Sequence, residues 1–331
     1  MSERGPQLST SAFIANLGPG EHSVWRFLAT LAGGIGGGLV AGLLVGVVSI
    51  LVFAAGDGLL GHDLAGFPLR IQSLIDPRTP TLTSSLFLML LAVTTNGPLA
   101  LTFIVIAALI AHRPLRGYVT AAPSPRWRML LAGLVFAALA LGPLVAASVF
   151  LDPHAQRPPI LSLASDPGRR LVYAVAAVVL LIPAAAAEEV VFRGWLLRQS
   201  AALTRNPIAL MAINGVLFSA VHGDFAPGAF LTRALMGAGF VYMTLRLGGI
   251  EFSTGAHAAN NIMIVLFIQP LTTRLTPPTG VSADDVLQDG FLFASYVVMA
   301  EVTARWAPLR RWTGADQAAS RPAIAEAEHF A

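Results

Sequence analysis

The sequence predicts an all-α fold, a polytopic integral membrane protein with about eight transmembrane helices in one bundle. The first observation is composition: of 331 residues, 55% are hydrophobic and only 12% are charged, whereas soluble proteins carry about 25% charged residues. The second is the length of the apolar runs, several of which reach the roughly 20 residues that a helix needs to cross a bilayer. Most of the surface of this protein is therefore expected to face lipid.

Hydropathy places the eight helices in order along the chain. They are expected at 27–55, 82–111, 129–151, 171–197, 208–222, 228–245, 250–268 and 290–304. They divide the chain into a polar cytoplasmic tail (1–26), about three N-terminal spans (27–169), a core of about four spans (170–268), the last loop and span (269–307) and a flexible C-terminal tail (308–331). The first span is too long for the apolar core of a signal peptide, so we expect it to remain as an anchor.

Arginine marks the loops expected in the cytoplasm. The chain has no lysine, and the 112–128 loop carries Arg113, Arg116, Arg126 and Arg128 without an acidic residue, whereas the loops on the other side are rich in aspartate. Positively charged loops stay on the cytoplasmic side, so the pattern predicts a multi-pass protein of the inner (plasma) membrane with both termini in the cytoplasm. This topology explains the basic clusters, and no nucleic-acid partner is expected.

Packing alone explains the small residues of the first span. They are Gly33, Gly34, Gly37, Gly38, Gly42 and Gly46. Small residues let helix backbones approach closely in lipid, so they predict a packing seam and no ligand site. Asn96-Gly97-Pro98, inside the second span, is typical of a helix kink.

Charged residues within the spans are the first candidates for function, because an ionisable group at mid-bilayer costs roughly 2.5–3.5 kcal/mol on insertion scales. The six are Glu188, Glu189, Arg193, Arg233, Glu251 and Glu301. Three of them have simple explanations: Glu301 pairs with Arg305, Glu251 suits a helix N-terminus, and Arg233 pairs with Asp224 or another carboxylate. The chain contains no cysteine, so disulfides, thiolate metal sites and cysteine nucleophiles are excluded.

The remaining three charges lie together near the end of the fourth span. On a helix, Glu189 and Arg193 are i,i+4 neighbours in the favourable order for an ion pair. Glu188 lies about 100° around the helix from Glu189 and is left without that partner. An unpaired carboxylate in lipid suits a general base.

Two histidines are expected at the depth of Glu188. The chain turns at 206–207, 18 residues after Glu188 and 16 before His222, which is about 27 and 24 Å along antiparallel helices at 1.5 Å per residue. His257 and Asn261 share one face of the seventh span. Alone, His222 would be a helix cap and the His257/Asn261 pair would be interhelical glue, but together the three elements are expected to meet in the cytoplasmic half of the bilayer.

These motifs, in this order on membrane helices, resemble those of the CPBP family of intramembrane proteases. They read Glu188-Glu189-x-x-x-Arg193, Phe218-x-x-x-His222 and His257-x-x-x-Asn261. The family includes the type II CAAX prenyl proteases and bacteriocin-processing or immunity (Abi-like) proteins. The resemblance covers about residues 170–268, which would form the catalytic core of an eight-helix bundle.

The resemblance implies endopeptidase activity inside the membrane. Glu188 would polarise the attacking water and His222 would assist it, while His257 and Asn261 would hold the water or stabilise the oxyanion. Structural support would come from Glu189, Arg193 and Phe218. Members are widely labelled metalloproteases, and Glu188, His222 and His257 could form a zinc set of nitrogen and oxygen ligands. A metal-free glutamate mechanism uses the same residues, and the sequence does not choose between them.

The main alternative is a non-proteolytic membrane protein that keeps the same polar cluster, either a proton-coupled transporter or an immunity or scaffold protein. Transporters also use carboxylates and histidines inside the membrane, but no half-to-half repeat is visible, which counts against their commonest designs. For a protease, the expected partners are the lipid bilayer and a peptide or protein in or at the membrane. The Arg-only, Ala/Gly-rich composition is typical of bacteria, where prenylated substrates are not expected.

Overall fold

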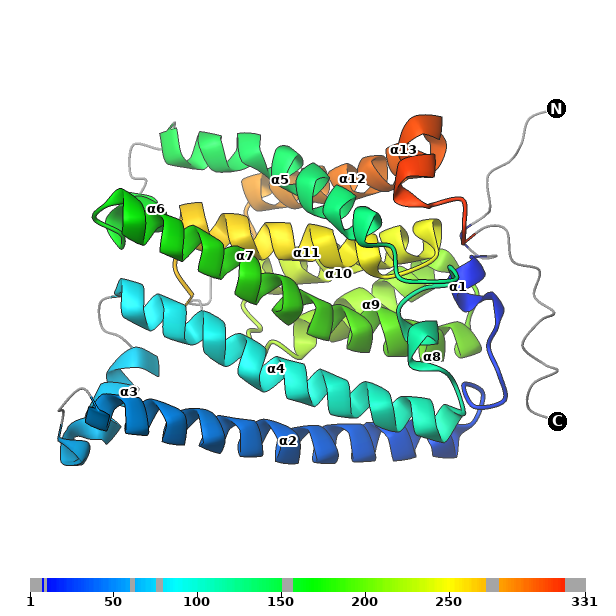
Figure 1. Cartoon of the computed structure of the whole chain (residues 1–331). Coiled ribbons are helices and arrows are strands. Elements are labelled where there is room, and N and C mark those ends of the chain that lie inside the picture. The colour runs from blue at the N-terminus through cyan, green and yellow to red at the C-terminus, as the bar shows by residue number, and fades with distance from the viewer. Residues whose placement is uncertain are drawn as a thin grey trace.

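The computed structural model describes residues 8, 11–59, 63–75, 80–150, 157–271 and 280–318, and this part of the chain is built from helices (Figure 1). The α-helices before the core are α1 (Ala12–Ala15), α2 (Val24–Leu59), α3 (Phe67–Ile75), α4 (Leu82–Ala111), α5 (Trp127–Phe150) and α6 (Pro159–Ser162). Those that follow are α7 (Pro167–Glu189), α8 (Leu197–Leu203), α9 (Pro207–Ala220), α10 (Pro227–Leu247), α11 (Glu251–Met263), α12 (Ala283–Arg305) and α13 (Ala307–Thr313). Two π-helical segments continue α7 and α11, η4 (Val190–Leu196) and η5 (Ile264–Ile268), and two 3₁₀ turns are η2 (Leu64–Gly66) and η3 (Leu115–Tyr118).

Six helices of the described chain are long and apolar enough to cross a membrane. They are α2, α4, α5, the continuous segment from α7 through η4 to α8, α10 and α12. The predicted all-α membrane fold is therefore confirmed. Each of the eight predicted ranges coincides with a described helix over most of its length, but α9 has only 14 residues, and α11 carries buried polar residues along most of its length. The count of eight spans is thus not confirmed, and α3 is a helix that the sequence did not predict.

Side-chain caps and a glycine set the ends of the helices that carry the polar cluster. Asp166 caps α7 by accepting a hydrogen bond from the backbone of Arg169, and Asn206 caps α9 in the same way at Ile208. After α10 the chain turns at Gly248, whose φ of 72° is a left-handed conformation that favours glycine. This tight turn brings α10 and α11 side by side.

Helix α11 occupies the centre of the bundle. It lies between α5 and α7 in Figure 1, and its residues from Glu251 to Asn260 are all buried. The helices α5 and α11 touch through their backbones, because glycines stand at the crossing on both sides, at Gly133 and Gly255. The polar residues of α11 are therefore enclosed by protein on several sides.

Helix α2 lies at the edge of the bundle and packs along α4 (Figure 1). The predicted glycine seam is confirmed for four of the six glycines. A Cβ at Gly33, Gly34, Gly37 or Gly38 would lie within 3.3 Å of an α4 atom, whereas one at Gly46 would meet nothing within 4 Å. The exposed residues of α2 are mainly leucine and valine, as expected for a helix that faces lipid.

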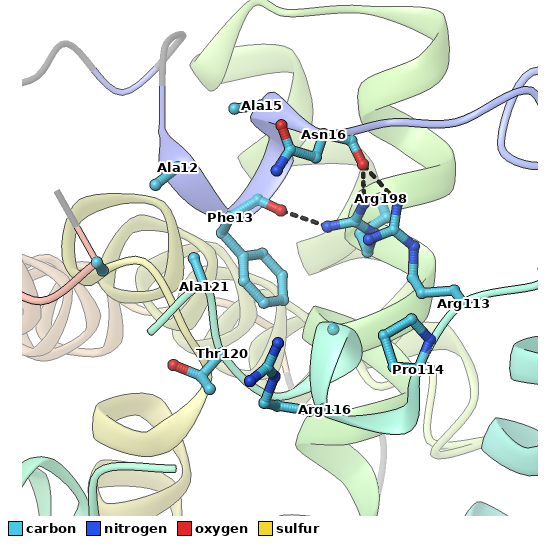
Figure 2. Close-up of a pocket in the computed structure, with 12 residues that line it drawn as sticks. Ala12, Phe13, Ala15, Asn16, Arg113, Pro114, Arg116, Thr120, Ala121 and Arg198 are labelled. Carbon is cyan, nitrogen blue, oxygen red and sulfur yellow. Dashed lines mark hydrogen bonds between the residues drawn. The ribbon is translucent and has the colours of Figure 1, made fainter. Parts of the chain in front are cut away.

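The N-terminal segment packs onto the bundle. Within the polar tail predicted over 1–26, Phe13 and Ile14 are buried. Arg198 of α8 donates hydrogen bonds to the backbone carbonyls of Phe13 and Asn16, and Arg113 donates to the carbonyl of Asn16 (Figure 2). The described part of this tail is therefore held in place, while residues 1–7 and 9–10 lie outside the described chain.

The C-terminal tail predicted over 308–331 also begins with packed structure. It starts with α13, and the chain then passes close to Gly248, where Ala318 is buried. Arg126 donates a hydrogen bond to the carbonyl of Gly314 at 3.4 Å. Residues 308–318 of the predicted tail are therefore packed against the bundle, and residues 319–331 lie outside the described chain.

Three of the intramembrane charges are paired away from the polar cluster. They are Arg233 with Asp224 (2.8 Å), Glu251 with Arg126 (2.7 Å), and Glu301 with Arg246 (2.6 Å) and Arg305 (2.5 Å). The pairs of Arg233 with Asp224 and of Glu301 with Arg305 agree with the prediction. Glu251 does begin a helix, as predicted, and gains a buried arginine as well.

Candidate active site

The end of α7 places two adjacent glutamates in different surroundings. The side chain of Glu189 is fully buried, whereas that of Glu188 is 24% exposed. Successive helical residues point about 100° apart, so Glu189 faces α11 and Glu188 faces the space between α4 and α9. Directly after them the helix widens into η4, and π-helical segments of this kind are frequent at functional sites.

Glu189 is the centre of a buried network. Its Oε1 accepts hydrogen bonds from Arg193 Nη1 and from His257 Nδ1, each at 3.0 Å. Arg193 is fully buried as well, donates to the carbonyl of Gly237 at 3.2 Å, and lies 4.2 Å from the centroid of the Phe218 ring. The predicted ion pair is therefore present, and Phe218 contacts its cation. Because buried charges are stable only when paired and hydrogen-bonded, this network holds α7, η4 and α11 together.

The two histidines turn the same ring nitrogen toward Glu188. Nδ1 of His222 lies 2.7 Å from the carbonyl oxygen of Phe218, which can only accept, so Nδ1 carries the hydrogen. Nδ1 of His257 is held by Glu189 in a similar way. In both rings Nε2 therefore faces the Glu188 carboxylate, at 4.0 Å for His222 and 3.7 Å for His257.

One oxygen of Glu188 lies near both of these ring nitrogens. This atom, Oε2, is buried and has no hydrogen-bond partner among the described residues. Both of its distances to Nε2 are longer than a direct hydrogen bond, and separations of this size leave room for a bridging water. The structure thus brings together Glu188, His222 and His257, the three residues that were predicted to meet.

The amide that contacts Glu188 belongs to a residue outside the predicted site. Asn261 follows His257 by one turn of α11, but its Oδ1 accepts a hydrogen bond from Asn260 at 3.4 Å. Instead, Asn96 of α4 donates from Nδ2 to Glu188 Oε1 at 3.5 Å. A sequence signal existed for Asn96, since an amide in the middle of an apolar span needs a polar partner, but that position was interpreted only as a kink.

An apolar cavity of about 630 Å³ borders Glu188. It is lined by Phe27, Leu31 and Ile35 of α2, by Asn96, Leu99, Ala100 and Phe103 of α4, by Ala187, Glu188, Val191, Phe192, Trp195 and Leu196 of α7 and η4, and by Leu217, Val221 and His222 at the end of α9. Trp195 stacks on Phe27 at 5.4 Å between ring centroids and meets Phe103 edge-on at 4.8 Å. The cavity therefore combines an aromatic and aliphatic wall with a polar corner formed by Asn96, Glu188 and His222.

The side chains that could form a zinc set lie further apart than zinc ligands do. Among the described residues, no three histidine, aspartate or glutamate side chains are arranged to hold a metal ion. Zinc bonds of about 2.0–2.2 Å in a tetrahedron place neighbouring ligand atoms roughly 3.3–3.5 Å apart, and Glu188 Oε2 lies 4.0 Å from His222 Nε2. We therefore derive no step through a metal.

Comparison with known proteins supports the resemblance drawn from the motifs. Residues 170–263 match the family described as type II CAAX prenyl endopeptidase Rce1-like. This match confirms the resemblance for the segment from α7 to the end of α11, which contains all the predicted site residues. The helices α2 and α4, which complete the cavity, lie outside it.

The chain is also similar to the uncharacterized protein YyaK of Bacillus subtilis (strain 168). The two are 32% identical over 166 residues, which is 48% of this chain and 54% of the relative. The match therefore spans about half the length of that relative. No solved structure matches the chain.

Proposed function

We propose that this protein is an intramembrane endopeptidase that hydrolyses a peptide bond of a membrane-associated peptide or protein. The observation that carries the proposal is the position of Glu188 Oε2, a buried carboxylate oxygen without a direct partner that faces Nε2 of two histidines, 3.7 and 4.0 Å away. Its carboxylate borders an apolar cavity. A base, two imidazole rings and an apolar binding space are what hydrolysis of a lipid-embedded chain needs. The match to an endopeptidase family supports the same conclusion.

Glu188 and His222 would activate the water. A water molecule between them would donate one hydrogen bond to Glu188 Oε2 and the other to His222 Nε2, because Nδ1 of His222 is already committed to Phe218. As the water oxygen bonds to the carbonyl carbon, one proton moves to Glu188. The same proton then passes to the amide nitrogen as the C–N bond breaks, which yields an amine and a carboxylic acid.

His257 would stabilise the oxyanion. Donors aimed at the developing negative charge are a large contribution to catalysis of acyl transfer. The Glu189 carboxylate, 3.0 Å from Nδ1 of His257, fixes the ring with Nε2 toward the site, where the Nε2–H of an imidazolium would donate to the oxyanion. Asn261, one turn further along α11, supplies a second donor in this proposal.

The cavity supports a substrate with apolar residues beside the scissile bond. Its lining is aliphatic and aromatic except at the corner that holds Glu188, so an apolar side chain would gain burial there while the peptide bond lies at the polar corner. In a bacterium this substrate class includes leader peptides and membrane-anchored regulators.

The orientation follows from the arginine-rich end of the bundle. The α4–α5 loop contacts the N-terminal segment through Arg113, and α1, α8 and α13 lie at the same end in Figure 1. By the positive-inside rule this end is cytoplasmic. The protein would accordingly span the inner (plasma) membrane with both termini in the cytoplasm.

The proposal is tested with purified protein in detergent and a library of fluorogenic peptides rich in apolar residues. Glu188→Gln should lower the cleavage rate by about 100-fold or more, because general-base catalysis contributes 10²–10⁴-fold. Glu301→Gln is the matched control, since that carboxylate binds Arg246 and Tyr242 instead. It should leave cleavage unchanged.

Undiminished cleavage by Glu188→Gln would contradict the assignment. Absence of cleavage by the wild type, together with proton-gradient-driven solute uptake into vesicles that Glu188→Gln abolishes, would replace the peptidase with a transporter.

A further inference from the structure

Asn96 is the polar residue on an otherwise apolar face of α4. This face, at spacings of three and four residues, comprises Asn96, Leu99, Ala100 and Phe103, and all four line the cavity. The other three side chains are apolar, so a leucine at position 96 would complete a uniform wall. The amide is therefore an exception that packing against an apolar cavity does not require.

The amide meets one particular oxygen of the carboxylate. Asn96 Nδ2 lies 3.5 Å from Glu188 Oε1, while Oε2 of the same carboxylate faces Nε2 of His257 and His222. A glutamate side chain has several rotatable bonds, and a buried group that must act at one position needs support from neighbouring side chains. A donor on Oε1 would fix the plane of the carboxylate and leave Oε2 to the histidines.

Asn96 contacts Glu188 from a different helix than the one that carries Glu188. Asn96 belongs to α4, which lies outside the segment that matches the endopeptidase family. Helix α4 is itself placed by its contacts with α2 and α7. The N-terminal helices would therefore contribute to the reaction centre as well as to the cavity wall.

We propose that Asn96 is a positioning residue for Glu188, which holds Oε1 so that Oε2 faces the bridging water. This inference rests on the proposed function for its kinetic test. A purely structural role, as a hydrogen bond between two membrane helices, is the competing explanation. The two explanations differ in what they predict for turnover at temperatures where the protein stays folded.

The kinetic test uses Asn96→Leu, which keeps the number and branching of the side-chain heavy atoms and removes the donor. We expect kcat to fall about ten-fold, as for other residues that orient a reacting group, while KM stays within about two-fold, because loss of orientation acts mainly on the transition state. Asn96→Gln, which keeps the amide, should recover part of the loss. Thr95→Val is the matched control, since Thr95 Oγ1 donates only within its own helix, to the carbonyl of Leu91 and weakly to that of Ala92.

An unchanged kcat in Asn96→Leu, in a preparation where Glu188→Gln is inactive, would overturn the inference and leave the proposed function intact. A lower melting temperature with unchanged kcat would assign the residue a structural role only. An equal loss of kcat in Thr95→Val would also overturn the inference, because a change anywhere in this part of α4 would then have the same effect as removal of the Asn96 amide.

A second measurement does not depend on cleavage. Dicyclohexylcarbodiimide modifies carboxyl groups in apolar surroundings, and a Glu188 carboxylate that has lost the donor on Oε1 is free to turn toward the apolar cavity. Asn96→Leu should therefore raise the rate of modification at Glu188 several-fold, Thr95→Val should not, and Glu188→Gln should show no modification at this position. An unchanged rate in Asn96→Leu would overturn the inference even if the wild type cleaved no peptide, whereas a raised rate without any cleavage would contradict only the proposed function.

Discussion

Substitution of Gly255 by alanine should separate the two helices that cross at the centre of the bundle. A Cβ at Gly255 would lie 2.0 Å from the carbonyl oxygen of Leu130 and 2.7 Å from the backbone nitrogen of Leu134, both in α5. The reverse contact is similar, since a Cβ at Gly133 would lie 2.1 Å from the carbonyl oxygen of Phe252. The obstacles are backbone atoms, so no side-chain rotation can relieve the clash.

The size of the displacement follows from these distances. Ordinary contact begins at about 3.4 Å, so a Cβ 2.0 Å from an oxygen requires the helices to part by about 1.4 Å. Overpacking of this kind costs typically 1–3 kcal/mol of stability. His257 lies two residues further along α11, and its Nε2 is 3.7 Å from Glu188 Oε2, so a shift of this size also disturbs the candidate site. Misplacement by about 1 Å can cost roughly 100-fold in rate.

The assay combines thermal unfolding in detergent with the peptide-cleavage rate. Gly255→Ala should unfold at a lower temperature and lose about 100-fold in turnover below that temperature. Gly142→Ala is the matched control, because it makes the same change in α5 where a Cβ would meet nothing within 4 Å. If Gly255→Ala has the same unfolding temperature and turnover rate as Gly142→Ala, the backbones of α5 and α11 do not approach as closely as described. The position of His257 on α11 relative to α5 would then be wrong as well.

Two further predictions concern the buried network and the metal. Glu189→Gln should destabilise the fold by about 3–5 kcal/mol, because it leaves the fully buried Arg193 without its carboxylate. A thermal melt in which Glu189→Gln is no less stable than Glu188→Gln would contradict this. Treatment with EDTA or 1,10-phenanthroline should leave cleavage unchanged, because the described side chains form no three-ligand metal group. Loss of cleavage that added zinc restores, with one zinc per chain by elemental analysis, would refute it.

Hydropathy and helix geometry were sufficient to predict the long apolar helices and the meeting of the polar residues. Long apolar runs in lipid have few alternatives to a helix, so each of the eight predicted ranges coincides with a described helix over most of its length. The ion pair of Glu189 with Arg193 follows from the i,i+4 spacing alone. The approach of Glu188 to His222 follows from similar lengths of chain on either side of one hairpin, and the structure places these groups 4.0 Å apart.

Contacts between distant helices could not be predicted in the same way. Nothing local in the sequence indicates that Arg126, 125 residues before Glu251, is its partner, or that Asn96 contacts Glu188 from 92 residues away. The short helix α1 was missed because its residues carry no long apolar run, and what holds it is a set of arginine hydrogen bonds to backbone carbonyls. Hydropathy alone could not decide which helices are long and apolar enough to cross the membrane, since α9 has only 14 residues and α11 carries buried polar residues along most of its length.

The two glutamates at the end of α7 differ in their partners, so that one supports the fold and the other is available for the proposed reaction. Both are carboxylates one residue apart, yet Glu189 is bound by a guanidinium and an imidazole, each at 3.0 Å, and has no exposed surface. Glu188 receives one long contact from Asn96 and keeps an oxygen without a direct partner. Because the network around Glu189 fixes His257, the position of the second histidine relative to Glu188 depends on the neighbouring glutamate. An arginine four residues after Glu188, at position 192 instead of 193, would therefore pair the carboxylate that borders the cavity and leave the buried Glu189 without its partner.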